Sequence, residues 1–446
     1  MLVVGVIAAG VLVVPRNEST PPAIGEIADL RLGRVPQTLT VDVSDEDSGL
    51  RSVAVRVLSG GGTKTLAERH FPGSLTRGGD TLREKIEIPL DVSTLGLADG
   101  EASLIIVARD WSLRNGLTGN SSQVSSSLAI DTKPPSLEVA GGLTYVYRGG
   151  SAAVRYRIAE EVATHGVRVA DAFFQGHPLA GEASDPRERV ALFTIPIGAP
   201  ENPTVRVVAQ DSAGNQSEAS FPLRIFERQF SASSITLSRG FLNKTVRPLA
   251  ESNGLTGANL GESFQQVNET LRDLNERKIQ EITLDGSSER RWQGGFEQLP
   301  NSKVTSRFAE KRSYRWDDRL ISKAIHYGFD LASTRAALVT ATNHGRVVFA
   351  GDLGIYGLCV ILDHGLGVHS LYAHLSQLNV SLGDEVSKSQ GVGHTGDTGL
   401  AGGDHLHFAI LVGGHYVDPL EWWDPKWVRS HIEWRLRPSN SNPASG

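Results

Sequence analysis

Short stretches in which apolar and polar residues alternate recur through the first half of the chain. The alternation runs through 38–45, 53–57 and 103–116, and it returns at 152–161 and 203–217. Successive side chains of a β-strand point to opposite faces, so a period of two predicts half-buried strands. Gly, Asn, Asp and Ser between these stretches are typical of turns. The pattern therefore predicts a first half built from short β-strands.

Two of these stretches end alike, in VARDWSLRNG (107–116) and VAQDSAGNQS (208–217), which predicts an internal repeat in which a strand runs into the same turn. Between the copies, Pro134 and Pro135 stop one strand ladder before the next begins. Segments 30–133 and 134–227 resemble bacterial immunoglobulin-like domains. We expect them to be spacers; wall-binding modules are the alternative.

Between 228 and 290 the apolar residues follow a helical period instead. In SFQQVNETLRDLNERKIQEI they recur three or four residues apart, at Phe264, Val267, Leu271 and Leu274. Ser263 stands where an N-cap is expected. The pattern predicts a short helical connector that docks on the C-terminal domain through this stripe.

Glycine-rich turns and short apolar strands return between 325 and 420, in RVVFAG, LCVILDHG, HSLYAHL and HLHFAILVGG. Strands of this length with glycine at the turns predict an antiparallel β domain, which we place at 291–430. The run WWDPKW (422–427) predicts a packed closure of that domain, with stacking on a glycan as the alternative. Residues 431–446 are expected to be a flexible tail.

An unbroken apolar run, MLVVGVIAAGVLVV, opens the chain and stops at Pro15. It is shorter than the roughly 20 residues that span a bilayer as a helix, and no positive charge precedes it. We interpret residues 1–15 as the end of an export signal or membrane anchor whose start lies upstream. The alternative is a buried N-terminal strand.

Composition narrows the chemistry. The 446 residues leave room for about three domains. The net charge of −6, without a long basic stretch laced with aromatic residues, argues against nucleic acid as a partner. The single cysteine, Cys359, excludes an intrachain disulfide and a paired-cysteine metal site, and its apolar surroundings predict a core residue. Any metal site must therefore use histidine and carboxylate.

Three motifs in the C-terminal quarter carry histidines. HYGFD sets His326 and Asp330 four residues apart across a bend at Gly328, LYAHL carries His374, and DHLHF places His405 and His407 on one face of a strand. Catalytic zinc sites take three His, Asp or Glu ligands and leave a fourth position to water. His326, Asp330 and one histidine of the pair supply that set, which leaves two histidines for proton transfer.

These motifs, in this order, resemble the LytM/lysostaphin-type zinc endopeptidases that cut peptidoglycan peptides, over roughly residues 290–425. The resemblance implies that His326, Asp330 and His407 bind one zinc ion. It implies that His374 and His405 are catalytic and flank the bound water. The expected fold is therefore mainly β: two immunoglobulin-like sandwich domains, a short helical connector and a C-terminal antiparallel β metallopeptidase domain.

The sequence departs from the family pattern beside the last motif, where Asp404 precedes and Ala409 follows. Neither is a ligand position, so the departure puts substrate preference in doubt before catalysis. The other histidines of this region are expected at the surface or in hydrogen bonds: His344, His364, His369, His394 and His415. Among them, His369 is the candidate for a groove residue.

The function expected from the resemblance is a zinc metalloendopeptidase of a bacterial cell envelope that hydrolyses peptide bonds in peptidoglycan stems or cross-links. It would be anchored in the inner membrane by its first residues or exported, with an envelope protein as a further partner. A catalytically silent regulator that activates another wall hydrolase is the alternative. Such relatives typically lack ligands, whereas all five site residues stand here. A peptidase that cuts envelope proteins is a third reading.

Overall fold

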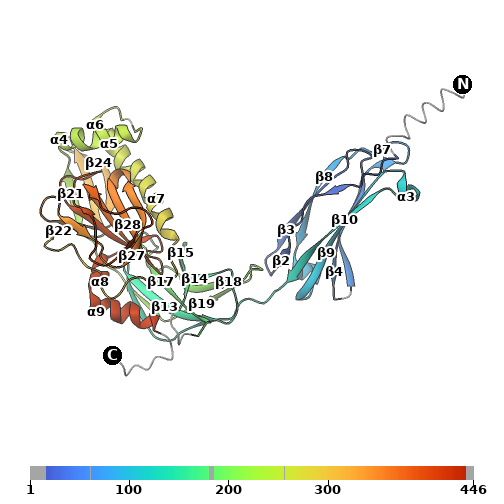
Figure 1. Ribbon diagram of the computed structural model, residues 1–446, viewed down its shortest axis with the longest axis horizontal. Coiled ribbons are helices and arrows are strands. Elements are labelled where there is room, and N and C mark those ends of the chain that lie inside the picture. The colour runs from blue at the N-terminus through green and yellow to red at the C-terminus, as the bar shows by residue number, and fades with distance from the viewer. Residues whose placement is uncertain (1–16, 61, 180–184, 256, 438–446) are drawn as a thin grey trace. The chain divides into compact units, whose positions relative to one another are not determined.

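The computed structural model describes residues 17–60, 62–179, 185–255 and 257–437 (Figure 1). The fold is mainly β, and the chain divides into two compact units, Met1–Pro135 with Gln210–Ser217 and Ser136–Ala209 with Glu218–Gly446. Within the described residues, no helix is long and apolar enough to cross a membrane. The expected anchor at 1–15 lies outside them.

In the first unit two larger sheets enclose one apolar core, and a two-stranded sheet is formed by β6 (Gly73–Ser74) and β7 (Gly78–Gly79). One larger sheet has the strand order β1-β3-β8 and the other β2-β10-β9-β4-β5. The bounds are β1 (Ala23–Ile24), β2 (Leu30–Leu32), β3 (Gln37–Ser44), β4 (Leu50–Ser59), β5 (Gly62–His70), β8 (Arg83–Leu90), β9 (Gly100–Asp110) and β10 (Ser121–Ile130). Alternate residues of both sheets, such as Val41 and Ile106, fill the core. The predicted strands are confirmed, and the immunoglobulin-like identity stays a prediction.

The repeated turn is present in both copies. Asp211 Oδ1 accepts from the backbone N–H of Asn215 (2.9 Å), whose side-chain amide donates to Asp211 Oδ2 (2.8 Å). Asp110 is held in the same way by Asn120, at 2.6 and 2.9 Å. The partner in the first copy is therefore Asn120 and not Asn115, because the longer loop there contains the short helix α3 (Arg114–Leu117).

The second unit begins with further strands that belong to the core of the C-terminal domain. Their sheets have the orders β11-β13-β17-β16, β15-β14-β18-β19 and β12-β20. The bounds are β11 (Leu137–Val139), β12 (Thr144–Tyr147), β13 (Ser151–Ile158), β14 (Thr164–Val169), β15 (Ala172–Gln175), β16 (His177–Pro178), β17 (Glu188–Thr194), β18 (Val205–Gln210), β19 (Gln216–Ala219) and β20 (Leu223–Phe226).

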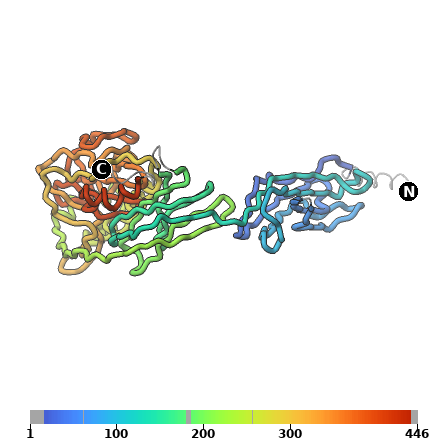
Figure 2. The backbone as a smooth tube through the Cα atoms, turned by 90° about the horizontal axis from the view of Figure 1, so that it is seen from below, coloured from blue at the N-terminus to red at the C-terminus, as the bar shows by residue number. Residues whose placement is uncertain are grey.

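One hydrophobic cluster runs from these strands into the C-terminal domain. It joins Phe193 of β17 to Phe408 and Trp422, and the Trp422 indole N–H donates to Ser151 Oγ at 3.0 Å. In Figure 2 the red C-terminal helices lie against the green strands of the same unit. Because this segment shares a core with the C-terminal domain, the expected spacer role is kept for residues 30–133 alone.

The central sheet of the C-terminal domain has the order β22-β25-β33-β29-β28-β27-β31, with β34 paired to β33. Its strands are antiparallel, as predicted. The bounds are β22 (Lys303–Ser306), β25 (Phe329–Ala332), β27 (Gly345–Asp352), β28 (Leu358–Gly365), β29 (Val368–Leu375), β31 (Glu385–Val386), β33 (Leu406–Val412) and β34 (His415–Val417).

Both faces of this sheet are covered. Leu406, Phe408 and Ile410 of β33 point into the cluster shared with the first strands of the unit. The intervening Ala409 and Leu411 point into a second cluster, formed with the connector helices. Cys359 lies in this second cluster and is fully buried, so its predicted role as a core residue is confirmed.

Two smaller sheets flank the central one, with the orders β21-β23-β24 and β26-β32-β30. Strand β21 belongs to the connector and pairs in parallel with β23. The bounds are β21 (Ala232–Thr236), β23 (Glu310–Trp316), β24 (Arg319–His326), β26 (Leu338–Thr340), β30 (Gln377–Leu378) and β32 (Gly391–His394). The connector is thus tied to the C-terminal domain by backbone hydrogen bonds as well as by its helices.

The connector helices are α4 (Arg239–Phe241), α5 (Arg247–Ser252), α6 (Leu260–Gln265) and α7 (Arg272–Leu284), with π-helical turns at Leu242–Val246 and Gln266–Leu271. Phe264, Val267 and Leu271 are buried as predicted, whereas Leu274 is 51% exposed. The wider turn before α7 rotates the helix, so Asn275 takes the inward position. The N-cap is Asn259, whose side chain accepts from Glu262 N–H, and not Ser263.

The C-terminal closure extends further than predicted. Helices α8 (Pro419–Trp423) and α9 (Pro425–Trp427) are followed by helical turns Val428–Ile432 and Glu433–Leu436. Trp422 meets Trp292 edge-on at 5.5 Å between ring centres, which confirms the packed role of the WWDPKW run. Because Ile432 and Arg435 are also buried, the predicted flexible tail does not begin at residue 431, and its remainder, 438–446, lies outside the described residues.

Candidate metal centre and catalytic site

His326, Asp330 and His407 converge at one point beside the central sheet. His326 ends β24, and Asp330 on β25 lies directly opposite His407 on β33 in the strand register. Asp330 Oδ1 lies 2.9 Å from His326 Nε2 and 3.0 Å from His407 Nδ1, and the two nitrogens are 2.9 Å apart. The three residues predicted as ligands therefore present one donor atom each to a common centre.

The donor set fits a metal ion. His326 Nδ1–H donates to the Arg307 carbonyl (3.0 Å), which leaves the lone pair of Nε2 facing the other two donors. Burial lowers the pKa of His407 to about 4, so its imidazole is neutral near pH 7. A cation between these atoms would bind lone pairs that otherwise face one another. Ligand atoms on a tetrahedral zinc lie about 3.3 Å apart, close to the observed spacing.

Asp330 is held as a carboxylate. Burial opposes its charge, but the charge and hydrogen bond of His326, together with His405 and His407, hold the pKa of Asp330 well below its usual range. Its second oxygen, Oδ2, accepts from Arg312 Nη2 at 2.9 Å. Arg312 is itself fixed by Glu310, at 3.1 Å from Nε, so the carboxylate is oriented from behind.

His374 reaches the site through a break in the strand pattern. The pairing of β28 with β29 shifts register between Leu358 and Val360, which leaves an extra residue on β29. His374 adopts a φ of 60° there. Its Nδ1–H donates to the Thr398 carbonyl at 2.8 Å, and its ring lies 5.8 Å from that of His407. Burial holds the pKa of His374 well below its usual range.

His405 lies on the other side of the centre, 4.8 Å from His374 between ring centres. Its Nδ1–H donates to the Gly403 carbonyl (2.7 Å), and its Nε2 lies 3.6 Å from Asp330 Oδ1. Burial opposes the charged form, but the hydrogen bond and charge of Asp330 outweigh it and raise the pKa of His405. The two predicted catalytic histidines therefore flank the donor set, each with Nδ1 bound to a backbone carbonyl.

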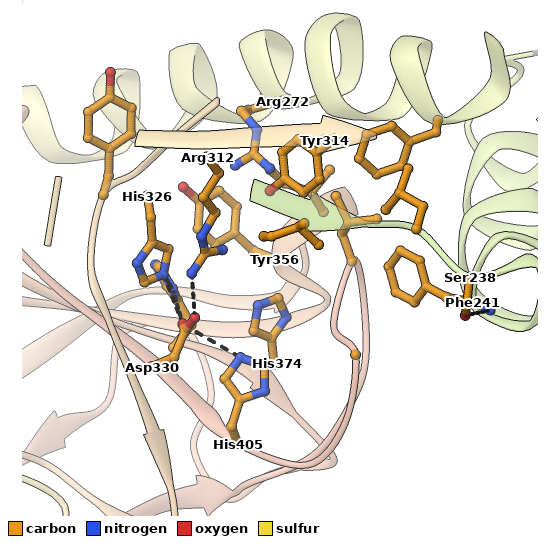
Figure 3. Close-up of a pocket in the computed structure, with 18 of the residues that line it drawn as sticks. Ser238, Phe241, Arg272, Arg312, Tyr314, His326, Asp330, Tyr356, His374 and His405 are labelled. Atoms are coloured by element: carbon orange, nitrogen blue, oxygen red, sulfur yellow. Dashed lines mark hydrogen bonds and ion pairs between the residues drawn. The ribbon is translucent and has the colours of Figure 1, made fainter. Parts of the chain in front are cut away.

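The five residues line one end of a cavity of about 390 Å³ (Figure 3). The opposite wall comes from the connector, through Ile235, Leu237, Phe241, Phe264 and Arg272. Arg312, Tyr314 and Tyr356 complete the wall between the two ends. The sequence prediction missed these contributions. For Arg312 and Tyr314 a signal existed, because they share one face of the alternating KRSYRW strand.

The remaining sequence predictions have structural outcomes. His369 is fully buried, lies 3.7 Å from Asp363, and does not line this cavity. Asp404 accepts from Thr395 Oγ1 (2.6 Å) and from Ala336 N–H (3.0 Å), so it joins two loops beside His405. Ala409 is buried against the connector cluster. These two departures from the family pattern thus have packing roles here.

Comparison with known proteins places this region in one family. Residues 324–419 match Peptidase family M23. The DD-carboxypeptidase/endopeptidase Mpg of Neisseria meningitidis serogroup B is 35% identical over 129 residues, which are 28% of this chain and 29% of that protein. The murein hydrolase activator NlpD of Salmonella dublin is 34% identical over 131 residues, 28% of this chain and 34% of that protein.

Among solved structures, the catalytic domain of lysostaphin from Staphylococcus simulans is 28% identical, with a TM-score of 0.25 over 29% of this chain and 96% of that one. The match to this chain covers only about a third or less of the length of the two curated relatives named above. The matched segment contains His326, Asp330, His374, His405 and His407. Residues 324–419 of this chain are an M23 peptidase domain with a candidate His-Asp-His metal site.

Proposed function

We propose that the protein is a zinc-dependent endopeptidase that hydrolyses peptide bonds in peptidoglycan stem peptides or cross-links. The observation that carries this proposal is the convergence of three donor atoms within 3.0 Å of one another, with His374 and His405 beside them in a cavity. Two nitrogens and one carboxylate oxygen are a donor set typical of catalytic zinc, in which a fourth position is left to water.

In this mechanism His326, Asp330 and His407 would hold the zinc ion, which when bound would activate a water molecule and polarise the scissile carbonyl. Arg312 donates to Oδ2 of Asp330 and orients its carboxylate. The strand pairing of Asp330 with His407 fixes the spacing of two of the ligands. The protein's task at this end of the cavity is thus to keep three donors aimed at one point.

His374 and His405 handle protons and developing charge. Each has its Nδ1–H committed to a backbone carbonyl, so each turns Nε2 toward the reacting groups. A neutral Nε2 accepts a proton from the attacking water, and a protonated Nε2 donates to the oxyanion or to the leaving amine. Burial lowers the pKa of His374, whereas the hydrogen bond and charge of Asp330 raise that of His405.

The substrate assignment draws on the relatives. One is named as a DD-carboxypeptidase/endopeptidase and another as a murein hydrolase activator, both of which point to peptidoglycan. A cell-wall substrate implies a location in the bacterial envelope, with residues 1–15 as the export signal or inner-membrane anchor. Residues 30–133 would be an immunoglobulin-like spacer, and an envelope protein would be a further partner of the chain.

The alternative function is a catalytically silent regulator that activates another wall hydrolase. The Salmonella relative is named as a murein hydrolase activator. A silent regulator needs no intact ligand set, whereas here three ligands, their supporting Arg312 and both flanking histidines stand together. The site therefore favours catalysis. A peptidase acting on envelope proteins would use the same chemistry, and it differs only in what the cavity admits.

One experiment separates these functions. The purified chain from residue 17 onward, loaded with one equivalent of zinc, is incubated with purified sacculi, with soluble cross-linked muropeptides and with denatured envelope protein. Released fragments are identified by mass spectrometry, and a chelated sample is the control. We expect zinc-dependent cleavage of muropeptides. Cleavage of none of the three substrates, combined with stimulation of another wall hydrolase added to the sacculi, would support the regulator instead.

Export is tested separately. A reporter that is active only outside the cytoplasm, fused after Gly446 of the full chain, should be active. A signal from a cytoplasmic reporter at the same position would contradict the proposed location.

A further inference from the structure

The connector places an arginine with spare hydrogen-bond capacity in the wall of the catalytic cavity. Arg272, at the first position of α7, is half-buried and lines the same cavity as the five site residues. Figure 3 shows its side chain reaching from the helix toward the cavity, on the side of Arg312 and Tyr314. Its hydrogen bonds within the described residues go only to Asn268, from Nε and Nη2. Nη1 therefore remains for a ligand.

The guanidinium is held in place by a buried amide. Asn268 is almost fully buried, and its Nδ2–H groups donate to Ser322 Oγ (2.8 Å) and to the Lys323 carbonyl (3.3 Å). Its Oδ1 is thereby turned toward Arg272 and accepts from Nη2 at 2.9 Å. Because this amide is neutral, it orients the cation without neutralising it.

Arg312, the other arginine of the cavity, shows the contrast. It forms ion pairs with Glu310 and Asp330 at 3.1 and 2.9 Å, so its charge is already used inside the protein. Arg272 forms no ion pair with a described residue. Asp273 on the same helix pairs with Arg277 instead, and Glu276 is bound by the Tyr356 hydroxyl at 2.6 Å. Burial raises the pKa of Glu276, and the charge of Arg272 opposes that rise without forming an ion pair. A partly buried guanidinium without an ion-pair partner raises the free energy of the fold, unless a ligand supplies the missing negative charge and hydrogen bonds.

We propose that Arg272 binds a carboxylate of the substrate next to the scissile bond. The inference rests on the proposed peptidase function and adds a specificity determinant from outside the matched family segment. Peptidoglycan stems carry such groups in two places, the α-carboxylate at the chain end and the carboxylate of an acidic residue within the stem. Apolar residues that line the same cavity, such as Ile355 and Leu400, suit small alkyl side chains like that of alanine. Guanidinium recognises carboxylate through paired hydrogen bonds.

The test compares three synthetic stem pentapeptides with the sequence L-Ala-γ-D-Glu-L-Lys-D-Ala-D-Ala. One has both carboxylates free, one has an amide at the C-terminus, and one has an amide on the glutamyl α-carboxylate. The zinc-loaded chain is compared with R272M, R272K and the matched control R277M, which alters an exposed arginine of the same helix. Zinc content and the thermal midpoint confirm that each variant is folded.

For wild type, we expect amidation of the recognised carboxylate to raise KM about 10- to 100-fold. R272M should show the same rise in KM on the free-acid peptide, with kcat nearly unchanged. Amidation of the peptide should raise its KM no further. R272K keeps the positive charge but cannot form the paired hydrogen bonds of a guanidinium, so its KM should lie between those of wild type and R272M. R277M should match wild type. The peptide whose amidation matters identifies which carboxylate is bound. Equal KM values for R272M and wild type on all three peptides would overturn the proposal.

A binding measurement distinguishes this proposal from the proposed function. Fluorescence anisotropy of the labelled free-acid peptide is recorded with zinc-free wild type and R272M. Tighter binding by wild type, without any cleavage once zinc is added, would support the carboxylate site and contradict the peptidase. Cleavage with no dependence on Arg272 in either assay would support the peptidase and contradict the carboxylate site. If neither binding nor cleavage depends on Arg272, the carboxylate site is wrong.

Discussion

The two faces of the central sheet both bury histidines and use them in opposite ways. On the face that packs against the first strands of the second unit, His364 is fully buried. Its Nδ1–H donates to the His344 carbonyl at 2.6 Å, and its Nε2 shares a hydrogen bond with Ser370 Oγ at 2.7 Å. Both nitrogens have protein partners, and the side chain does not line the catalytic cavity. His364 is therefore a structural residue.

On the connector face the pattern differs in one respect. His326, His374 and His405 each bond one nitrogen to a backbone carbonyl, of Arg307, Thr398 and Gly403 respectively. The other nitrogen of each faces the metal centre or the cavity. Burial alone does not separate ligands from structural histidines in this domain. In His364 both nitrogens bond structural groups, whereas in His326, His374 and His405 the second nitrogen faces the candidate metal centre or the cavity.

The largest expected effect comes from removing a ligand. H326A, D330A and H407A each leave two protein donors, so zinc content should fall from about one per chain to near zero, and muropeptide cleavage should be lost. Elemental analysis of dialysed protein beside fragment release measures both. H364Q on the opposite face is the comparison, and it should keep its zinc. Full activity in the three ligand variants would remove the enzyme proposal.

The next effect comes from the flanking histidines. H374A and H405A keep all three donors, so they should bind zinc as wild type does while losing proton transfer and charge stabilisation. We expect a loss of about 100- to 10,000-fold in kcat. Single-turnover cleavage of a soluble muropeptide by zinc-quantified protein measures it. Should H405A lose zinc while H407A keeps it, the roles of the two histidines in HLH are reversed.

A smaller effect is expected from Arg312, which is not a ligand but donates to the ligand Asp330. R312M removes the donor on Asp330 Oδ2, so zinc affinity should weaken about 10- to 100-fold, with cleavage recovering when excess zinc is supplied. Competition with a chromogenic chelator measures the affinity. R315M, on the exposed face of the same strand, is the matched control and should leave the affinity unchanged. A zinc affinity for R312M equal to that of wild type would show that Asp330 needs no such support.

The sequence predicted those parts of the site whose residues follow the regular alternation of a β-strand. His405 and His407 share a face because they are two residues apart, and the antiparallel strands appear where the apolar runs placed them. The spacing of His326 and Asp330 was equally readable, because a bend at Gly328 joins two short strands. Their assignment as metal ligands, and that of His374 and His405 as catalytic, stays a proposal that the first two experiments test.

Other features break the local period and could not be read in that way. His374 faces the cavity because a β-bulge and a φ of 60° turn its side chain, and regular alternation would place it opposite Ala373. Leu274 is exposed because a π-helical turn shifts the register of α7. Arg272 and Arg312 enter the site only through packing between segments far apart in sequence. Each depends on tertiary structure that no local pattern encodes.

The smallest expected effect on catalysis, and the sharpest contrast with the ligands, belongs to His364. H364Q removes the imidazole that joins the His344 carbonyl to Ser370, so the free energy of unfolding at pH 7.5 should fall by about 1–3 kcal/mol, with zinc content and kcat unchanged.

The pH dependence of the free energy of unfolding gives a second readout. Burial lowers the pKa of His364 to about 4, below the unfolded value near 6.5, so the unfolded chain takes up the proton first as the pH falls. Wild type should therefore lose stability between pH 6.5 and pH 4, by up to about 3 kcal/mol from this residue, and H364Q should lose correspondingly less. Urea unfolding of both proteins at pH 7.5 and pH 5.0 measures the difference. Parallel losses in the two proteins would show that His364 is not held neutral in the fold, and a loss of zinc in H364Q would mean that the two faces of the sheet are coupled.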